Sequence, residues 1–492
     1  MKPIMFVGTG SDVGKSVINA GFCRIFKQDG YRPAPFKAQN MSLNSYPTPD
    51  NLEIGRAQAV QAEAAGVECS VLMNPLLLKP ISNCSSQVIL HGKPIGNRSA
   101  VEYFRGANRD QLFDEVKRSF DSLSQEYSPI VMEGAGSISE MNLWDSDITN
   151  MRMAQYANAA TILVADIDRG GVFASVYGSI MLLPDEQRRL IKGVIINKFR
   201  GDISLFDQGR DLLEKITGVK VIGVLPYFKD IFIEQEDSVS LEHIESAQNE
   251  SQGVKIAVVR LPSISNFTDF NTLSMCNGVN LSYVQNAQQI EDADIVILPG
   301  SKSTISDLVY LRRMALDGAI LKHHKAGKPI YGICGGYQMM GEMVYDPELI
   351  EGDVAEIAGL GILPVSTTIK RGKVTRQCHF KMANSSIEGD GYEIHAGETP
   401  SDSPLAKMDN GEEDGYFKSD RCWGSYIHGI FDNQGVVNSI MQCVDGADQA
   451  VREVEDYRSM KERNYDLLAD AIRQSVDMEY IYKIMSDDSG AR

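Results

Sequence analysis

The sequence lacks several features that would define whole classes of protein. No apolar run is long enough to cross a bilayer, and the first residues form a short apolar strand that ends in a glycine-rich loop rather than a secretory signal. The eight cysteines are scattered, with no Cys-x-x-Cys pair and no metal-ligand spacing. A formal net charge of −18 at pH 7 disfavours nonspecific binding of nucleic acid. These absences favour a cytoplasmic globular protein with free thiols and without nucleic-acid or membrane partners.

The length of the chain and its alternation of strand-like and helix-like segments predict more than one α/β domain. A chain of 492 residues is too long for one hydrophobic core. Buried-strand runs alternate with amphipathic stretches over residues 1–240, which is typical of a parallel sheet, and this rhythm restarts at residue 254. We predict a first domain at 1–245, a polar linker at 246–253, a second domain at 254–445, and a helical C-terminal tail at 446–492 that packs on the second domain.

The predicted strands end in clusters of glycine and polar residues. In the first domain they cover residues 4–7, 130–132, 161–165, 193–196 and 221–225, and in the second 255–259, 295–298 and 329–333. Open parallel sheets bind their ligands at the carboxyl ends of the strands. We therefore look for functional residues directly after these segments.

The first such segment leads into a phosphate-binding pattern. An apolar strand, a loop from Gly8 to Gly14, and Lys15–Ser16 at the start of a helix follow in the order that phosphate binding needs. Backbone N–H groups of the loop bind phosphate oxygens, Lys15 adds a mobile cation, and the Ser16 hydroxyl is offered to Mg²⁺. The spacing departs by one residue from the strict Gly-x4-Gly-Lys-Ser/Thr pattern. A chance glycine turn is the alternative, but the order of the parts favours the phosphate loop.

The altered loop, which includes Thr9, resembles that of the dethiobiotin synthetase group of ATP-dependent ligases. The resemblance implies ATP and Mg²⁺ as cofactors, with Lys37 as a second cation for the transferred phosphoryl group. It also implies that Glu133, and less firmly Glu53, bind the Mg²⁺, and that Asn197 contacts the nucleotide base. Taken singly, each acid fits a solvated or capping carboxylate equally well.

A nucleophile pattern stands in the second domain. Cys334 lies between a predicted strand and a predicted helix, with glycines two residues before and two residues after it. A helix N-terminus lowers the pKa of a thiol, and a histidine is still needed to protonate departing ammonia. His428 is the first choice and His395 the second, although either can be structural. The backbone amides of Gly300 and Gly335 are candidate oxyanion-hole donors.

These residues resemble a class I glutamine amidotransferase domain, which implies a flavodoxin-like fold. The chain departs from that family at one point, because Ile430 stands where the family has a glutamate two residues after the catalytic histidine. The third member of the triad is absent or comes from elsewhere. We therefore predict a Cys334–His428 dyad.

The two sites together predict a glutamine-hydrolysing carbon–nitrogen ligase. Glutamine hydrolysis supplies ammonia, and ATP activates a carboxylate as an acyl phosphate that ammonia then displaces. The domain order and five stretches resemble the cobyric acid synthase family of corrinoid amidases; the stretches are residues 37–45, 53–58, 74–80, 166–174 and 197–202. That resemblance implies amidation of four carboxylates of adenosylcobyrinic acid a,c-diamide in cobalamin biosynthesis, with L-glutamine and the corrinoid as substrates.

The acceptor site is the least defined part of this prediction. A polyanionic corrinoid needs a local basic rim on so acidic a chain, and the candidates are Lys79, Arg56, Arg98, Arg105, Arg109 and Arg169. Asp147 is a candidate for ordering ammonia or the substrate amides. Two alternatives remain, namely another carboxylate amidase of this class, and a noncatalytic nucleotide switch with a degenerate second domain. The intact glycine elbow around Cys334 argues against the switch.

Overall fold

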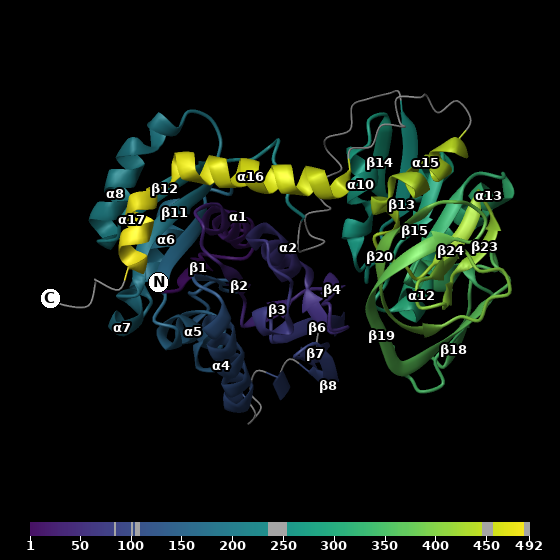
Figure 1. Cartoon of the computed structure of the whole chain (residues 1–492), viewed down its shortest axis with the longest axis horizontal. Coiled ribbons are helices and arrows are strands. Elements are labelled where there is room, and N and C mark those ends of the chain that lie inside the picture. Colours follow the sequence, from purple (N-terminus) through teal and green to yellow (C-terminus); the bar gives the residue numbers. More distant parts are fainter. Residues whose placement is uncertain (83–84, 100–101, 104–108, 235–252, 445–455, 487–492) are drawn as a thin grey trace. The chain divides into compact units, whose positions relative to one another are not determined.

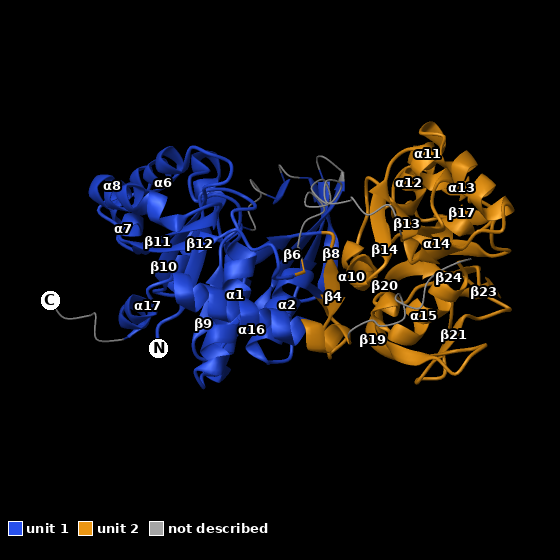
Figure 2. Ribbon diagram, turned by 90° about the horizontal axis from the view of Figure 1, so that it is seen from above, with its two compact units in different colours: residues 1–42, 54–233, 461–492 blue, residues 43–53, 234–460 orange. Residues whose placement is uncertain are grey.

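The computed structural model divides into two compact units (Figures 1 and 2). It describes residues 1–82, 85–99, 102–103, 109–234, 253–444 and 456–486. Unit 1 comprises residues 1–42, 54–233 and 461–492, and unit 2 comprises residues 43–53 and 234–460. Among the described residues, no helix is long and apolar enough to cross a membrane.

Unit 1 is built on a six-stranded parallel sheet, as predicted. Its order is β12-β11-β10-β1-β9-β2, with β1 Ile4–Gly8, β2 Ala34–Phe36, β9 Ile130–Glu133, β10 Ala160–Asp166, β11 Ile191–Phe199 and β12 Val221–Pro226. All seven residues of β10 are buried, because helices cover both faces of such a sheet and the strands read as continuous apolar runs. The carboxyl ends of these strands carry the phosphate loop, Glu133 and Asn197.

Helices and a small second sheet complete unit 1. The helices are α1 Lys15–Gln28, α2 Arg56–Ala65, α4 Arg109–Glu126, α5 Met151–Tyr156, α6 Val172–Met181, α7 Asp185–Arg188 and α8 Asp207–Thr217, with 3₁₀ turns η1 Val71–Met73, η2 Met141–Ser146 and η3 Ile203–Phe206. The small sheet has the order β3-β6-β7-β8, from β3 Gln39–Met41, β6 Leu76–Ser82, β7 Ser85–Leu90 and β8 Lys93–Ser99.

The C-terminal helices pack on unit 1, so the prediction that the tail packs on the second domain is wrong. Helix α16 (Tyr457–Ser475) lies along α1, where the Cβ position of Gly21 is 2.3 Å from Ile472 Cδ1. Arg24 of α1 pairs with Glu462 at 2.8 Å and with Asp466 at 2.7 Å. The following helix α17 (Met478–Met485) joins the same hydrophobic core. The apolar stripe of α16 fits the face of α1, and composition alone cannot identify such a partner.

Unit 2 restarts the α/β pattern and confirms the predicted fold class. Its main sheet has the order β14-β13-β15-β16-β24-β23, from β13 Val254–Val259, β14 Val279–Val284, β15 Ile295–Leu298, β16 Ile330–Ile333, β23 Tyr416–Ser419 and β24 Cys422–Ser425. Only the edge pair β23–β24 is antiparallel among the pairings of this sheet in the described residues. The core strands β15 and β16 are wholly buried.

A second sheet and short helices surround this core. The second sheet has the order β18-β17-β19-β21-β22, with β20 paired to β19; the strands are β17 Met343–Tyr345, β18 Glu356–Ala358, β19 Ser366–Met382, β20 Glu388–Glu398, β21 Ala406–Met408 and β22 Glu413–Asp414. The helices are α10 Asn271–Met275, α11 Ala287–Glu291, α12 Thr304–Arg313, α13 Leu316–Lys325, α14 Gly335–Met340 and α15 Gln434–Gln442, with turns η5 Phe267–Phe270 and η6 Ile430–Asp432.

One segment of the predicted first domain groups with unit 2. Residues 43–53 contain β4 (Ser45–Pro47), which pairs with β5 (Glu53–Gly55). Residues 246–252 of the predicted linker lie outside the described residues. The domain boundaries drawn from the sequence therefore stay predictions, with this segment as the observed difference.

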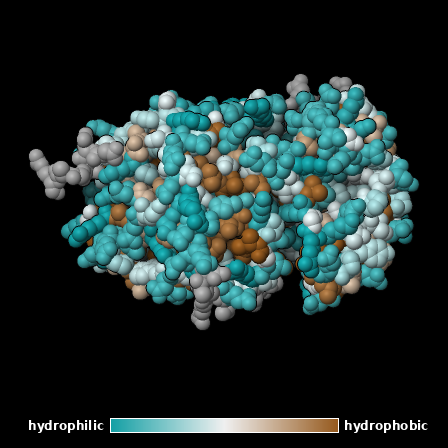
Figure 3. Space-filling model, turned by 60° about the horizontal axis from the view of Figure 1, so that its bottom comes forward, coloured by the Kyte–Doolittle hydropathy of each residue, from teal (hydrophilic) through white to brown (hydrophobic). Residues whose placement is uncertain are grey.

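The face in Figure 3 is mainly hydrophilic, with apolar side chains gathered near its middle and others placed singly. In unit 1 the exposed apolar residues include Met41, Met141 and Leu205, and in unit 2 they include Val309 and Leu349. Isolated exposed apolar residues are normal for a globular protein and need no partner to explain them.

Candidate active sites

The phosphate loop of unit 1 contains a glycine, Gly14, at a position where a side chain would be strained and crowded. Gly14 has a φ of 95°, and a Cβ there would lie 2.1 Å from Nδ2 of Asn197. Asn197 donates from that nitrogen to the backbone oxygen of Val13 at 2.8 Å. The structure therefore places Asn197 as a brace of the loop, and its contact with a nucleotide base stays a prediction.

Lys15 begins α1, and its ammonium group folds back over the loop. Its Nζ donates to the backbone oxygens of Gly10 at 2.8 Å and Gly136 at 3.1 Å. A Cβ at Gly8 would lie 2.9 Å from this nitrogen, so the first glycine of the pattern keeps room for the cation. The amide of Thr9 donates to β10 at 3.0 Å, which fixes the start of the loop on the sheet. The loop thus holds a buried cation beside backbone N–H groups.

Glu133 is the centre of the unit 1 site. Its Oε1 accepts from the Ser16 hydroxyl at 2.8 Å and from Lys37 Nζ at 2.9 Å, and its Oε2 accepts from Gln61 Nε2 at 2.7 Å. Burial by itself raises the pKa of Glu133, but the charge of Lys37 and these hydrogen bonds outweigh it and lower the pKa. The carboxylate of Glu133 is therefore ionised and joins two other predicted residues, Ser16 and Lys37.

Sequence reasoning missed Gln61. It lies on α2, a helix rich in alanine whose side chains are almost all buried. A polar side chain on such a helix needs a partner, since an unpaired buried amide is costly. That signal was present in the sequence, but nothing in it named Glu133 as the partner.

The donor set of unit 1 fits a magnesium–nucleotide complex better than a metal held by protein alone. Within the described residues no group of three or more His, Cys, Asp or Glu side chains could hold a metal ion. Ser16 and Glu133 offer one hydroxyl and one carboxylate, and Mg²⁺ commonly binds few protein ligands together with phosphate oxygens and water. Glu53 groups with unit 2, where Ser45 and Lys373 each contact its carboxylate at 2.6 Å, and its role as a Mg²⁺ ligand stays a prediction.

The two predicted acceptor residues have different environments. Arg169 is exposed and lies 3.6 Å from a carboxylate oxygen of Asp12. Asp147 accepts from the backbone amides of Thr149 at 2.8 Å and Asn150 at 3.1 Å. Asn150 in turn donates to the backbone oxygen of Ala135 at 2.9 Å. Asp147 therefore braces the loop that follows β9, and its contact with substrate stays a prediction.

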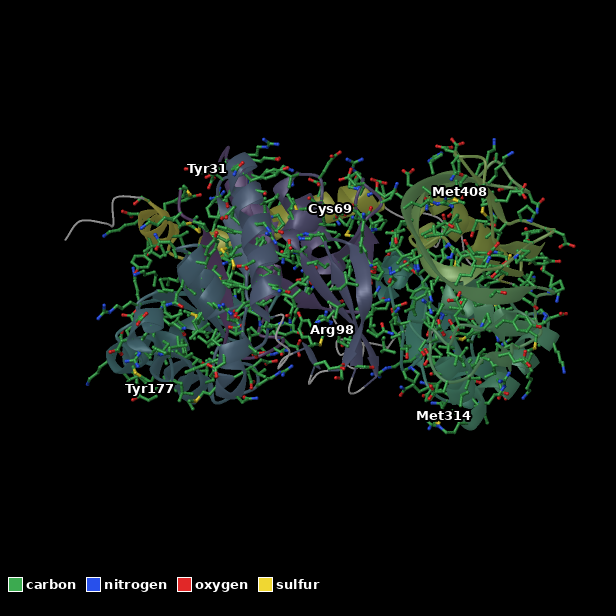
Figure 4. The ribbon with its side chains drawn as sticks, turned by 90° about the horizontal axis from the view of Figure 1, so that it is seen from below. Tyr31, Cys69, Arg98, Tyr177, Met314 and Met408 are labelled. Atoms are coloured by element: carbon green, nitrogen blue, oxygen red, sulfur yellow. The ribbon has the colours of Figure 1, made fainter. Side chains whose placement is uncertain are left out.

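The predicted basic rim is mostly buried. Lys79, Arg56 and Arg109 are each less than 9% exposed, and Arg109 donates to the backbone oxygen of Ser146 at 2.6 Å. Arg98 is half-buried on β8 and is labelled in Figure 4. Arg105 lies outside the described residues. Of the described candidates, Arg169 and Arg98 are the ones with substantial solvent access.

In unit 2, Cys334 stands on a sharp turn between β16 and α14. Its φ of 50° is in the left-handed region, which a residue other than glycine rarely adopts. Its amide donates to the backbone oxygen of Ser425 at 2.7 Å, which fixes the turn on β24. A Cβ at Gly336 would lie 1.9 Å from the backbone oxygen of Leu298, so that position requires glycine. The predicted elbow is present, and it turns the thiol out of the strand.

His428 completes a three-residue chain with Cys334 and Asp269. Cys334 lies close enough to His428 for its charge to raise the pKa of the imidazole, and Nδ1 of His428 lies 2.7 Å from Asp269 Oδ2. Asp269 Oδ1 also accepts from the backbone amide of Gly429 at 3.0 Å. His428 and Asp269 are at most 2% exposed. The predicted dyad was therefore incomplete, because Asp269 supplies from a distant turn the carboxylate that Ile430 cannot.

The electrostatics of this chain favour a charged imidazole. Burial lowers the pKa of His428, but the charges of Asp269 and Cys334 outweigh burial and raise the pKa to about 10. Because Nδ1 is committed to Asp269, Nε2 is the nitrogen left for the thiol. Protonated His428 next to a sulfur nucleophile is the arrangement needed to deliver a proton to a leaving amine.

The alternative histidine has another role. His395 Nδ1 lies 2.8 Å from the backbone oxygen of Gly397, and its Nε2 lies 3.3 Å from Oε1 of Glu393. Its ring stacks on Tyr426 with a centroid distance of 3.8 Å. Both nitrogens thus face oxygen acceptors, which leaves neither of them to act on the thiol.

The two predicted oxyanion-hole glycines lie beside the same reactive groups. Gly300 follows β15, and a Cβ there would lie 3.2 Å from Cε1 of His428. Gly335 is the first residue of α14, and a Cβ there would lie 2.7 Å from the amide nitrogen of Ser301. The first amides of a helix have no partner within that helix. The role of both amides as donors to a substrate oxygen stays a prediction.

Comparisons with known proteins agree with this division of labour. Residues 4–240 match the family described as the CobQ/CobB/MinD/ParA nucleotide binding domain, and residues 255–436 match the CobB/CobQ-like glutamine amidotransferase domain. Over 495 residues the chain is 55% identical to a cobyric acid synthase of Bacteroides fragilis, covering 99% of each chain. It is 55% identical to one of Phocaeicola vulgatus, covering 99% of each, and 47% identical to one of Thermoanaerobacter sp., covering 98% of each. Because the chain matches both domain families and is 55% identical to a cobyric acid synthase over almost its full length, it belongs to the cobyric acid synthase family.

Proposed function

We propose that the chain is an ATP- and glutamine-dependent amidoligase that converts four carboxylates of adenosylcobyrinic acid a,c-diamide into carboxamides. One observation carries the chemistry: a Cys334–His428–Asp269 chain in one unit accompanies a phosphate loop with Lys37 and Glu133 in the other. The corrinoid substrate itself comes from the family, since the relatives bear the name cobyric acid synthase.

The unit 2 residues account for release of ammonia from glutamine. The Cys334 sulfur attacks the carboxamide carbon, and the amides of Gly300 and Gly335 stabilise the negative charge on its oxygen. His428 then gives its proton to the nitrogen as the carbon–nitrogen bond breaks, so ammonia leaves and the glutamyl group stays on Cys334 as a thioester. Water attacks the thioester while His428 takes the proton back, which releases glutamate and frees the sulfur. Asp269 holds Nδ1 of the imidazole throughout and stabilises its charge.

The unit 1 residues account for activation of the acceptor. The loop amides and Lys15 bind the phosphates of ATP, and Lys37 contacts the γ-phosphoryl group as it moves to the carboxylate. Ser16 and Glu133 are the residues that hold Mg²⁺, which neutralises phosphate charge when bound. Ammonia attacks the carbonyl carbon of the acyl phosphate, and phosphate leaves with the bonding pair. Each amide formed therefore consumes one ATP and one glutamine.

The cytoplasmic location stays a prediction from this chemistry. Both ATP and a reduced catalytic thiol are normally available in that compartment. Arg169 and Asp147 stay candidate acceptor contacts within the same proposal.

Mass spectrometry of the corrinoid product tests the function directly. We expect wild type to make carboxamides from glutamine or from ammonium, with ADP formed in step with each amide. Cys334→Ser should lose glutamine-dependent product by about a thousandfold or more while keeping the ammonium reaction, because only the nucleophile of unit 2 is removed. Equal glutamate release by wild type and Cys334→Ser, or ADP formation unlinked to amide formation, would overturn the proposal. Absence of glutamate release by wild type would favour a binding module instead.

A further inference from the structure

Residues 43–53 leave unit 1 after Ser42 and return to it at Ile54, and between these points they belong to unit 2 (orange in Figure 2). Four polar side chains of this 43–53 segment are almost fully buried there, with Asn44, Ser45, Thr48 and Glu53 each at most 1% exposed. Polar side chains buried to this degree need hydrogen-bond partners. Their partners show what the segment does.

The segment supports the turn that carries Asp269. Asn44 Oδ1 accepts from the backbone amide of Phe267 at 3.3 Å, at the start of η5. The backbone oxygen of Ser45 accepts from Asn266 Nδ2 at 3.0 Å. Asn266 is the residue before η5, has a φ of 52°, and accepts from the Asp269 amide at 3.0 Å. The segment thus supplies acceptors to both residues that begin the Asp269 turn.

A second set of contacts leads from the segment to His428. The ring of Tyr46 packs edge-on against Tyr392 with a centroid distance of 5.0 Å, and the ring of Tyr392 stacks on His428 at 5.2 Å. Tyr392 and His428 also exchange both of their backbone hydrogen bonds, at 3.0 and 2.8 Å. The hydroxyl of Tyr392 accepts from Asn266 at 2.9 Å, so the two sets of contacts meet.

The segment is anchored firmly in unit 2. Lys373 of β19 contacts the Glu53 carboxylate at 2.6 Å, and Ser45 donates to the other oxygen of that carboxylate at 2.6 Å. Gln377, further along β19, donates to the backbone oxygen of Pro47 at 3.0 Å. These bonds stabilise β4, because a strand of three residues forms too few ladder hydrogen bonds to be stable alone.

The two ends of the segment belong to the framework of the unit 1 site. Asn40 donates to Gln58 at 2.9 Å, which closes the base of the excursion. Asn74 accepts from the amide of Gly55 at 3.3 Å and donates to the backbone oxygen of Lys37 at 3.1 Å. The segment returns directly into α2, the helix that carries the glutamine bound to Glu133. One continuous piece of chain therefore joins the phosphoryl-transfer residues to the support of Asp269 and His428.

We propose that the 43–53 segment positions the His428–Asp269 pair and makes glutamine hydrolysis respond to the state of the ATP and acceptor site. Asn44 and Tyr46 are the positioning residues, since one holds the Asp269 turn and the other packs on the tyrosine that covers His428. Binding of nucleotide and acceptor shifts Lys37 and Glu133, and the segment carries that shift to the imidazole. This inference rests on the proposed function, because it assigns a control to the ammonia step of that reaction.

The test measures glutamate release with and without ATP and the corrinoid. We expect wild-type hydrolysis to rise when both are present. Asn44→Ala and Tyr46→Ala should lose this rise and lower kcat for glutamine about tenfold with KM almost unchanged, while the ammonium-dependent reaction continues. Asp50→Ala is the matched control, because Asp50 lies at the exposed tip of the same segment.

Two further readouts separate positioning from simple loss of packing. Asn44→Asp keeps an oxygen acceptor for Phe267 and should restore most of the rise that Asn44→Ala removes. In the plot of kcat against pH, the fall at alkaline pH should also begin at lower pH for Asn44→Ala, because a misplaced Asp269 no longer keeps the imidazole protonated. An unchanged fall at alkaline pH, or no recovery in Asn44→Asp, would overturn the assignment.

The failure of this inference and of the proposed function can be told apart. If wild type makes amides but hydrolyses glutamine equally with and without ATP and acceptor, the coupling is overturned and the function stands. If wild type makes no amide from glutamine, the proposed function fails. If both alanine variants keep the wild-type rise, the segment is excluded as the link.

Discussion

The reactive groups of the two sites are held in opposite ways. In unit 2 they lie together, with His428 near the Cys334 thiol and its Nδ1 hydrogen-bonded to Asp269. In unit 1 the cations rest on protein oxygens instead, Lys15 on backbone carbonyls of the loop and Lys37 on Glu133. The thiol site therefore already has its imidazole paired with a carboxylate. The phosphoryl site must exchange these contacts for phosphate oxygens before it can act.

The pKa directions follow the same division. The pKa of His428 is raised and the pKa of Glu133 is lowered, so each buried side chain stays charged. In unit 2 that charge takes part in the chemistry as a proton to be given away. In unit 1 it pairs with Lys37, and a buried ion pair is costly to break when only one partner is removed. The comparison predicts that variants of unit 1 affect every nitrogen donor, whereas variants of unit 2 affect glutamine alone.

The largest effect should come from Glu133→Gln. The variant keeps the shape of the side chain but removes the charge that pairs with Lys37 and that, in the proposed function, would bind Mg²⁺ together with Ser16. We expect amide formation to fall by about a thousandfold or more with either glutamine or ammonium, because phosphoryl transfer depends on electrostatic stabilisation. Product analysis by mass spectrometry with both nitrogen donors is the measurement.

The control for this variant is Glu140→Gln, since Glu140 is exposed in the same loop region. Basal glutamate release by Glu133→Gln should stay within about twofold of wild type, because the thiol site is complete within unit 2. Survival of the ammonium reaction in Glu133→Gln would show that Glu133 is a structural partner of Lys37 and no more.

Asp269→Asn should produce the next largest effect, and only with glutamine. Loss of the carboxylate charge lowers the pKa of His428 from about 10, because burial then acts with less opposition. At the alkaline end His428 loses the proton it must give to ammonia, so the fall in kcat should begin at lower pH than in wild type. At neutral pH we expect a loss of about 10²–10⁴-fold in glutamate release, as for other carboxylates that orient a catalytic imidazole.

The pH profile of glutamate release is the decisive measurement for Asp269. Asp353→Asn, in an exposed loop of the same unit, is the control and should leave the profile in place. An Asp269→Asn profile that coincides with wild type would return the site to the dyad predicted from the sequence.

Gly14→Ala should have a smaller effect, which is a loss of nucleotide affinity in unit 1. A Cβ at this position meets Asn197 Nδ2 at 2.1 Å, and the φ of 95° disfavours any side chain. We expect nucleotide affinity to fall about tenfold or more, because the loop amides can no longer converge on the phosphates. Calorimetric titration with ATP measures this directly. Gly178→Ala is the matched control, since a Cβ there meets nothing within 4 Å, and equal affinities for the two variants would contradict the role given to the loop.

How far the sequence predicted this structure depended on how local each signal was. The strands, the phosphate loop and the Cys334 elbow can each be predicted from a few consecutive residues, because they are apolar runs that end in glycine turns. His428 was found the same way, since it follows a strand and precedes a glycine. Each of these features is fixed by short-range backbone geometry, and short-range patterns are what a sequence displays.

The missed features depend on contacts between distant parts of the chain. Asp269 precedes His428 by 159 positions, and the segments that carry them follow β13 and β24, which have two other strands between them in the sheet. The ion pair of Glu53 with Lys373 also joins distant positions in the chain, while the predicted role of Glu53 as a Mg²⁺ ligand stays a prediction. Helix α16 shows an apolar stripe whose partner, α1, lies more than four hundred residues earlier. Such pairings follow from shape complementarity, which no local pattern records.

The smallest expected effect on chemistry concerns this returning helix. Ile472→Ala removes the side chain that meets Gly21, in a position that is fully buried. Deleting a buried isoleucine side chain to alanine costs about 2–5 kcal/mol of stability, so unit 1 should unfold at lower temperature. We expect hydrogen exchange of α1 to rise while that of β16 and β24 stays slow.

The matched control is Leu467→Ala on the same helix, because Leu467 is 44% exposed and its removal leaves no cavity. Glutamate release should survive in both variants, whereas ATP-dependent amidation by Ile472→Ala should fall at temperatures where wild type is still active. Equal exchange rates in α1 for the two variants would mean that α16 contributes little to unit 1. Selective exposure of α1 would show instead that the last helices are a working part of the ATP-binding unit, although they follow the amidotransferase unit in the chain.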